Sequence, residues 1–187
     1  MTDLALGVQR ATWGVRVLAV ILGAALVALA AQVSIPLPGT PVPMTLQPMA
    51  VLLVGGLLGP QLGALSMILY LAMGAAGLPV FTPTVPLVGV ARLFGPTGGY
   101  LLAYPLAAWA VGAVMREAPS MWRAACGVLA GLVLIHLGGL AQLAILTGSI
   151  AGAAQLATVP FLLGDLLKLA ILVPVLAKLT PTIRARL

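Results

Sequence analysis

Long apolar runs alternate along the chain with short segments rich in proline, glycine or charge. Six of these runs have the composition of membrane-spanning helices, and they cover residues 15–31, 46–58, 62–78, 99–115, 124–147 and 156–177. A hydrocarbon core of about 30 Å is crossed by roughly 20 residues of α-helix. Backbone polar groups in lipid must be satisfied within the chain, so runs of this kind cross as helices. The pattern predicts an all-α membrane protein with six transmembrane helices, forming a single domain over residues 1–187.

The second predicted helix, residues 46–58, is short for a full crossing. At a rise of about 1.5 Å per residue it would extend for only about 20 Å. The pair Gly59-Pro60 follows it, and this dipeptide is typical of a turn. We therefore expect a chain reversal at this pair, with the second helix either inserted partway or extended by neighbouring residues.

Two connections between the predicted helices are unusual because they are apolar yet cannot be helical. Residues 32–48 contain five prolines and one glycine, and residues 79–96 form a second connection with proline and glycine that carries Arg92. Proline lacks an amide proton and interrupts helices. An ordinary exposed loop would be more hydrophilic, so we expect residues 32–48 to fold over the bundle as a lid. A re-entrant loop at the membrane interface is the alternative.

The composition supports an integral membrane protein and argues against nucleic-acid binding. The chain is 62% hydrophobic and 6% charged, with a mean hydropathy of +1.21, values far from those of soluble domains. Eight of its nine basic residues are scattered over ends and loops, and the basic residues are not interleaved with aromatic residues, as a nucleic-acid surface would require. The single cysteine, Cys126, excludes an internal disulfide and a cysteine-rich metal site.

The positions of the basic residues predict the orientation in the membrane. Loops that face the cytoplasm are enriched in lysine and arginine. An even number of helices puts both termini on one side, and with cytoplasmic termini only Arg92 lies on the outer side. The basic residues then placed inside are Arg10, Arg16, Arg116, Arg123, Lys178, Arg184 and Arg186. Both proline-containing connections are therefore expected on the outer face.

Asp165 and Lys168 are the charged residues that fall inside the apolar core of a predicted membrane helix. An ionised side chain at the bilayer centre costs at least a few kcal/mol, so such residues are functional candidates. Their spacing of three puts them on one helical face, close enough to pair. Gln155 and Thr158 would extend this face toward the outer side. The pattern indicates a polar ligand site, and a structural ion pair between helices is the alternative.

Small residues on the first helix suggest a surface for another helix. Ala24 and Ala28 are four apart, with Gly23 beside them, and such residues let helices approach closely in lipid. Docking of a partner helix is one interpretation, and packing within the chain's own bundle is the other.

Sequence motifs for catalysis are missing. The chain has no Walker-type phosphate loop, so it cannot hydrolyse ATP by that route. It also lacks the GxSxG and HExxH patterns of hydrolases and metalloproteases. His136 stands alone in the fifth predicted helix, where an interhelical hydrogen bond is a more common role than ligand binding. We therefore expect neither an enzyme nor a metal site.

Several blocks of sequence resemble one family of membrane proteins. The blocks span residues 35–48, 58–60, 77–81, 94–100 and 164–168, and occur in this order along almost the whole chain. Together they are similar to the BioY family, the biotin-specific S components of energy-coupling factor (ECF) vitamin transporters. The block at residues 82–88 departs from the family, because it lacks the usual glycines and an asparagine near the ligand.

The resemblance implies an ECF S-component-like bundle in the cytoplasmic membrane of a prokaryote. Its expected function is high-affinity capture of biotin at the outer face, without a cofactor, for import driven by separate partners. These partners would be an ECF transmembrane T component and ABC-type ATPases. The resemblance also implies that Asp165 and Lys168 belong to the biotin site and that Ala24 and Ala28 dock the T component.

Biotin matches the residue types of the predicted site. Its ureido ring offers two N–H donors and one carbonyl acceptor, which Asp165 and Lys168 could satisfy by charge-assisted hydrogen bonds. Its carboxylate would be left for Arg92 or for the amides of Gly98 and Gly99. The remaining candidate contacts are Thr45, Gln47, Tyr100 and Tyr70, although a packed aromatic residue is the more common role for Tyr70.

Two other classes of function stay open at this point. A small membrane-embedded enzyme could use Asp165, Lys168 and His136. A structural or assembly subunit would use Asp165 and Lys168 only as an ion pair. A bound vitamin returned unchanged would argue against the enzyme, and the lack of a saturable ligand would favour the structural subunit.

Overall fold

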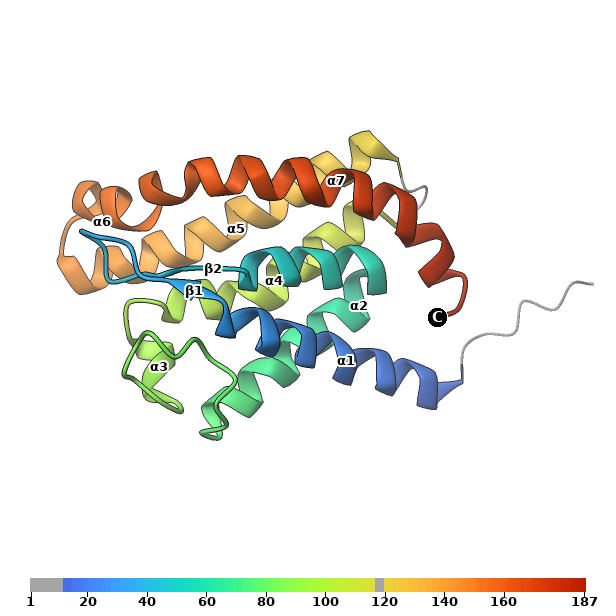
Figure 1. Cartoon of the computed structure of the whole chain (residues 1–187), viewed down its shortest axis with the longest axis horizontal. Helices are drawn as coiled ribbons and strands as arrows, with labels where there is room; N and C mark the ends of the chain where they lie inside the picture. Colours follow the sequence, from blue (N-terminus) through green and yellow to red (C-terminus); the bar gives the residue numbers. More distant parts are fainter. Residues whose placement is uncertain (1–11, 117–119) are drawn as a thin grey trace, which may run out of the picture.

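The computed structural model describes residues 12–116 and 120–187, so Arg10 of the orientation argument lies outside the described residues. The chain forms a bundle of long helices whose axes run roughly alongside one another (Figure 1). Its elements are α1 (Trp13–Gln32), β1 (Ser34–Ile35), β2 (Met44–Thr45), α2 (Gln47–Ala75), α3 (Ala91–Phe94), α4 (Gly98–Val114), α5 (Met121–Thr147), α6 (Ile150–Ala157), the 3-10 turn η1 (Val159–Phe161) and α7 (Leu162–Arg184). The mostly helical fold predicted from the sequence is confirmed.

Helix α2 consists of two arms that fold back on each other. Gly59 interrupts it with φ 84° and ψ 176°, a backbone conformation that essentially only glycine adopts. A Cβ at Gly63 would lie 2.8 Å from the Cα of Gly55, so the residues on either side of Gly59 face each other. The predicted reversal at Gly59-Pro60 is therefore present. The two arms account for the second and third predicted helices.

The helices have the length and apolarity that a membrane requires. Among the described residues, the segments Trp13–Gln32, Gln47–Ala75, Met121–Thr147 and Ile150–Arg184 are each long and apolar enough to cross, and Gly98–Val114 is a shorter apolar helix. The structure thus holds four candidate spans and one shorter apolar helix among the described residues, and the count of six crossings stays a prediction.

Close helix packing depends on glycines at the contacts. The Cβ position of Gly55 in α2 is occupied by backbone atoms of Ala108 in α4, and that of Gly99 in α4 by the carbonyl of Gly138 in α5. Small residues of this kind let membrane helices approach until their backbones touch. Gly98 and Gly99 thus have a packing role at the start of α4.

The sixth predicted helix, residues 156–177, is not continuous. Helix α6 ends at Ala157, Thr158 has non-helical angles, and η1 separates it from α7. Pro160 explains the break, because proline lacks an amide proton and disfavours a helical residue before it. Gln155 is exposed and lies on α6, so the predicted polar stripe along one continuous helix was wrong, although Thr158 and Asp165 line the same hollow between α5 and α7.

The small-residue face of α1 is turned toward the bundle. Ala24 is only 1% exposed, and Gly23 beside it lies against Ser66 and Val54 of α2. Ala28 is half-buried and packs on the core. Ala24 is therefore not part of a free docking face and lets α1 approach α2, the alternative given above, whereas a docking role for the half-buried Ala28 stays a prediction.

Candidate functional site

A cavity of about 50 Å³ lies among α2, α4, α5, α7 and the two proline-containing connections. The end of the bundle that holds β1, β2, α3 and α6 is opposite the end where the chain finishes (Figure 1). The polar residues that line the cavity are Thr45, Gln47, Thr82, Arg92, Thr97, Tyr100, Tyr104, His136, Asp165 and Lys168.

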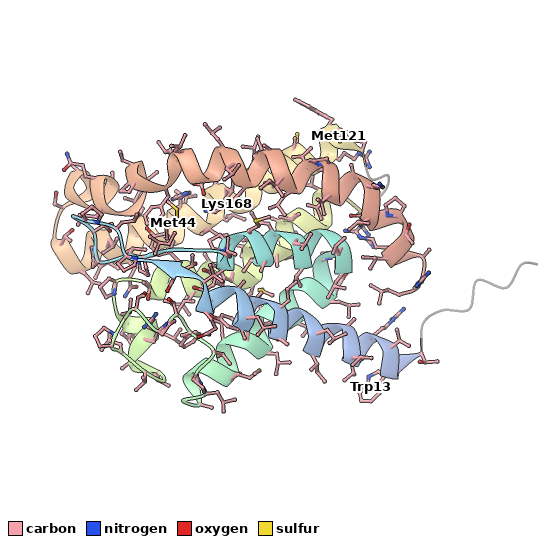
Figure 2. All side chains as sticks on the ribbon, viewed as in Figure 1. Trp13, Met44, Met121 and Lys168 are labelled. Carbon is pink, nitrogen blue, oxygen red and sulfur yellow. The ribbon has the colours of Figure 1, made fainter. Side chains whose placement is uncertain are left out.

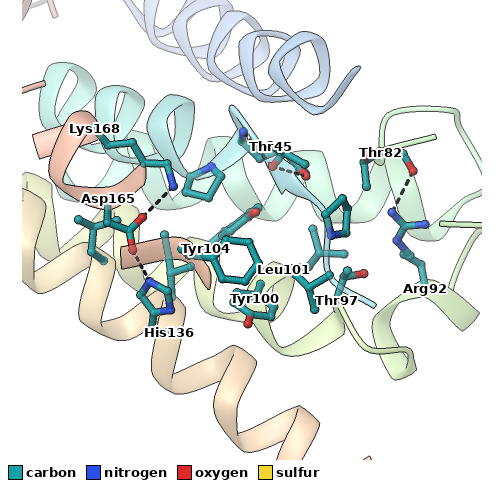
Figure 3. Close-up of a pocket in the computed structure, with 17 residues that line it drawn as sticks. Thr45, Thr82, Arg92, Thr97, Tyr100, Leu101, Tyr104, His136, Asp165 and Lys168 are labelled. Atoms are coloured by element: carbon teal, nitrogen blue, oxygen red, sulfur yellow. Dashed lines mark hydrogen bonds and ion pairs between the residues drawn. The ribbon is translucent and has the colours of Figure 1, made fainter. Parts of the chain in front are cut away.

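Asp165 is the centre of a buried charged cluster (Figure 3). Lys168 lies one turn further along α7, and its Nζ donates to Asp165 Oδ1 at 2.7 Å. The other carboxylate oxygen, Oδ2, is 2.5 Å from Nε2 of His136 on α5. Asp165 is 9% exposed and Lys168 8% exposed. The predicted pairing within one helical face is present, and the pair lines the cavity.

His136 is a site residue that sequence reasoning set aside. It does make an interhelical hydrogen bond, as expected, but the partner is the carboxylate of the candidate site. Its other ring nitrogen, Nδ1, lies 3.3 Å from the backbone oxygen of Ala157, which also accepts from Tyr100 Oη at 2.6 Å. The rule that selected Asp165, an ionisable group in an apolar run, would have selected His136 as well.

Aromatic rings form part of the cavity wall. Tyr100 lines the cavity and its ring centroid is 6.4 Å from that of Phe161 and 6.5 Å from that of His136. Tyr104, one turn further along α4, also lines the cavity. Tyr104 and Phe161 were missed because the sequence does not fix which face of each helix turns toward the others.

Gln47 and Thr45 line the cavity together. Thr45 Oγ1 donates to Gln47 Oε1 at 3.3 Å, and Gln47 Nε2 donates to Tyr70 Oη at 2.5 Å. Tyr70 is 0% exposed, does not line the cavity, and donates to the Val80 carbonyl at 3.2 Å. Tyr70 is therefore placed behind the site, where it orients Gln47, and the packed-aromatic interpretation describes it.

Arg92 organises the connection that precedes it. Its guanidinium donates to the carbonyls of Thr82 at 2.9 Å, Val85 at 2.6 Å and Leu87 at 3.2 Å. Arg92 is only 1% exposed, and this burial lowers the pKa of its guanidinium below the usual value. A guanidinium nevertheless stays charged at neutral pH. Most of its donors are thus engaged by the loop.

Two polar atoms in the cavity wall have no hydrogen-bond partner among the described residues. They are Nε of Arg92 and Oγ1 of Thr97, and both residues line the cavity. Buried polar groups are nearly always hydrogen-bonded. Both atoms are thus buried without a partner, whereas Gly98 and Gly99 do not line the cavity.

The connection after α1 covers the cavity on one side. Val42 and Pro43 are buried and line it, and Thr40 Oγ1 donates to the Leu156 carbonyl at 2.8 Å. The short antiparallel pair of β1 and β2, with Ser34 opposite Thr45, brackets this connection. The sequence did not predict these strands, but it did predict that the segment folds over the bundle.

Comparison with known proteins places the chain in a family. The model of the BioY family matches residues 7–185. The chain belongs to the BioY family. Family members described as biotin transporters include one from Thermotoga maritima, 40% identical over 148 residues, which covers 79% of this chain and 85% of that protein. A probable biotin transporter BioY from Pyrococcus horikoshii is 38% identical over 146 residues, covering 78% of this chain and 84% of that protein.

A solved structure supports the same grouping. The crystal structure at 2.1 Å of the S-component for biotin from an ECF-type ABC transporter superposes on this BioY-family chain with a TM-score of 0.81 and 25% identity. The match covers 92% of this chain and 95% of the other. The family and the bundle architecture suggested by the sequence blocks are thereby confirmed.

Proposed function

We propose that this chain is the biotin-binding subunit of a vitamin uptake transporter. The observation that carries the proposal is one cavity, in a chain of the BioY family, lined by a buried Asp165–Lys168–His136 cluster and by Arg92. Its relatives include proteins described as biotin transporters. The chain would act by binding and carrying biotin, and not as an enzyme.

The charge of the cavity suits an anionic ligand. Lys168 and Arg92 contribute two positive charges and Asp165 one negative charge, and among the described residues no second carboxylate lines the cavity. One positive charge is left over even with His136 neutral. Because an uncompensated buried charge is costly, the carboxylate of biotin would stabilise the site by neutralising it.

The polar groups can be assigned to the two ends of biotin. Asp165 would accept from a ureido N–H, and Lys168, with ammonium protons left beside its bond to Asp165, would donate to the ureido carbonyl. Arg92 Nε and Thr97 Oγ1 are the free donors for the carboxylate. Apolar side chains such as Leu132 and Phe161 would contact the thioether ring and the valeryl chain.

The basic residues of the sequence support an orientation, because loops that face the cytoplasm are enriched in lysine and arginine. Lys168 and Met44 lie toward the cavity end, and Trp13 and Met121 lie at the other (Figure 2). Trp13 is 81% exposed and Trp122 77% exposed, as is typical of aromatic residues at a membrane interface. We infer six crossings in the cytoplasmic membrane, with both termini in the cytoplasm and the cavity opening outward.

ATP-driven import would require further subunits. The chain carries no Walker-type phosphate loop, and its structural relative is an S-component of an ECF-type ABC transporter. We therefore propose a transmembrane T component and ABC-type ATPases as partners. Because Ala24 is buried, docking on α1 would use the exposed side chains Leu18, Leu22 and Leu29, or would require α1 to separate from α2.

Purification in detergent followed by mass spectrometry tests the proposal. Biotin should copurify with the wild-type chain, be released unchanged, and rebind to saturation. Recovery of a chemically altered compound would support the enzyme alternative. Absence of any saturable ligand for folded protein would support a structural subunit and overturn the proposal.

A further inference from the structure

The ring of His136 lies between two hydrogen-bond acceptors. Nε2 is 2.5 Å from Asp165 Oδ2, and Nδ1 is 3.3 Å from the backbone oxygen of Ala157. Figure 3 shows His136 and Lys168 on opposite oxygens of the same carboxylate. His136 is the only histidine of the chain, so no other imidazole can share its role.

Neither acceptor can supply a proton to the ring. A backbone carbonyl carries none, and the Asp165 carboxylate is held in its ionised form by the Lys168 ammonium at 2.7 Å. Moving a proton onto Asp165 would leave the ammonium of Lys168, only 8% exposed, without its counter-charge, which is strongly unfavourable in a buried site. A neutral imidazole has one N–H, whereas an imidazolium has two.

We propose that His136 is an imidazolium in this protein and acts as a positioning residue. Its Nε2–H holds the Asp165 carboxylate in the cavity wall. Its Nδ1–H holds the Ala157 carbonyl, at the point where α6 ends and the chain turns into α7. His136 thus fixes both the carboxylate and the bend that presents it.

An imidazolium at His136 adds one positive charge to the cavity. Three elements place side chains around the His136 ring. Asp165 of α7 contacts the ring, and Lys168 of the same helix contacts the other oxygen of that carboxylate. The uncharged side chains of Tyr100 from α4 and Phe161 from η1 lie beside the ring. A cationic His136 raises the excess among the described lining residues, Arg92 included, to two positive charges. If the chain binds biotin as proposed above, this second positive charge predicts that the site selects the carboxylate form of biotin over uncharged derivatives.

The state of the ring can be measured without any ligand. Labelling the protein with ¹⁵N-histidine gives two ring-nitrogen signals, both from His136. We expect nearly equal shifts for the two nitrogens at neutral pH, as in an imidazolium. Two widely separated shifts, as in a neutral ring, would overturn the proposal. Asp165→Asn is the control, because without the carboxylate the same ring should give separated shifts.

Selectivity is measured with biotin and its uncharged amide. His136→Asn keeps an amide donor but cannot be charged, so the ratio of the two affinities should fall by at least about fivefold, a typical coupling between two sites. If both ligands lose affinity equally, His136 acts only through structure and the selectivity claim fails. Failure of wild-type protein to bind biotin would instead refute the proposed function and leave the ¹⁵N result standing.

Discussion

Replacing Lys168 with methionine distinguishes a ligand site from a structural ion pair. The change removes the ammonium and keeps most of the side-chain length, so that packing along α7 is retained. Asp165, only 9% exposed, would lose the partner at 2.7 Å. Breaking a buried pair typically costs about 3–5 kcal/mol of folding stability. Because His136 remains bonded to Asp165, we expect a loss near the lower end, about 3 kcal/mol.

The effect on biotin affinity is separate. A charge-assisted hydrogen bond contributes about 1.5–3 kcal/mol, and each 1.4 kcal/mol corresponds to about tenfold in Kd. Lys168→Met should therefore weaken binding by roughly 10- to 150-fold. Titration calorimetry measures the affinity and thermal unfolding the stability. Lys178→Met is the matched control, since Lys178 is an exposed lysine on the same helix, and both quantities should stay unchanged.

The double variant Asp165→Asn/Lys168→Met decides between the two interpretations. With both charges removed and the His136 ring neutral in the absence of the Asp165 carboxylate, no unpaired charge is buried in this cluster, so stability should recover relative to Lys168→Met alone. Biotin binding should not recover, because both contacts with the ureido ring are missing. Wild-type affinity in the double variant would refute the assignment and leave the pair a structural role.

Three further changes test other parts of the structure. Gly59→Ala should lower the stability measured by thermal unfolding by about 1–3 kcal/mol, because φ 84° strains any other residue. The control Gly14→Ala, with no atom near its Cβ position, should not lower it. Equal stability of the two variants would contradict the reversal of α2 at Gly59. Arg92→Gln should speed hydrogen exchange in the loop whose carbonyls the Arg92 guanidinium binds, and it should weaken biotin binding about tenfold. Unchanged exchange in that loop would contradict the anchoring role of Arg92. Thr40→Val removes the hydrogen bond to the Leu156 carbonyl. In stopped-flow binding it should raise the biotin off-rate severalfold and leave the on-rate unchanged. An unchanged off-rate would mean that the connection between α1 and α2 does not retain the ligand.

The sequence predicted the helices well because apolar runs of sufficient length have few alternatives in lipid. It also predicted the reversal at Gly59-Pro60, where local chemistry decides the backbone. It did not predict the break before α7, although Pro160 is visible in the sequence, because the run around it is uniformly apolar. The strands β1 and β2 were missed since each is only two residues long.

The site was predictable where one residue carries the signal. A charge in an apolar helix identified Asp165 and Lys168, and both line the cavity. The sequence did not show which side of each helix faces the rest of the bundle. Ala24 is buried against the bundle, and Tyr104 and Thr97 line the cavity although the sequence analysis did not select them. The sequence of a helix that is apolar on all sides does not indicate which face is buried, so these contacts could be found only in the assembled bundle.

Titration of biotin into ligand-free, full-length protein tests the central claim most directly. The account predicts saturable binding of one biotin per chain, lost in Asp165→Asn/Lys168→Met protein that still unfolds cooperatively. Absence of saturable binding by the folded wild type, or equal binding by the double variant, would contradict the assignment of this cavity to biotin.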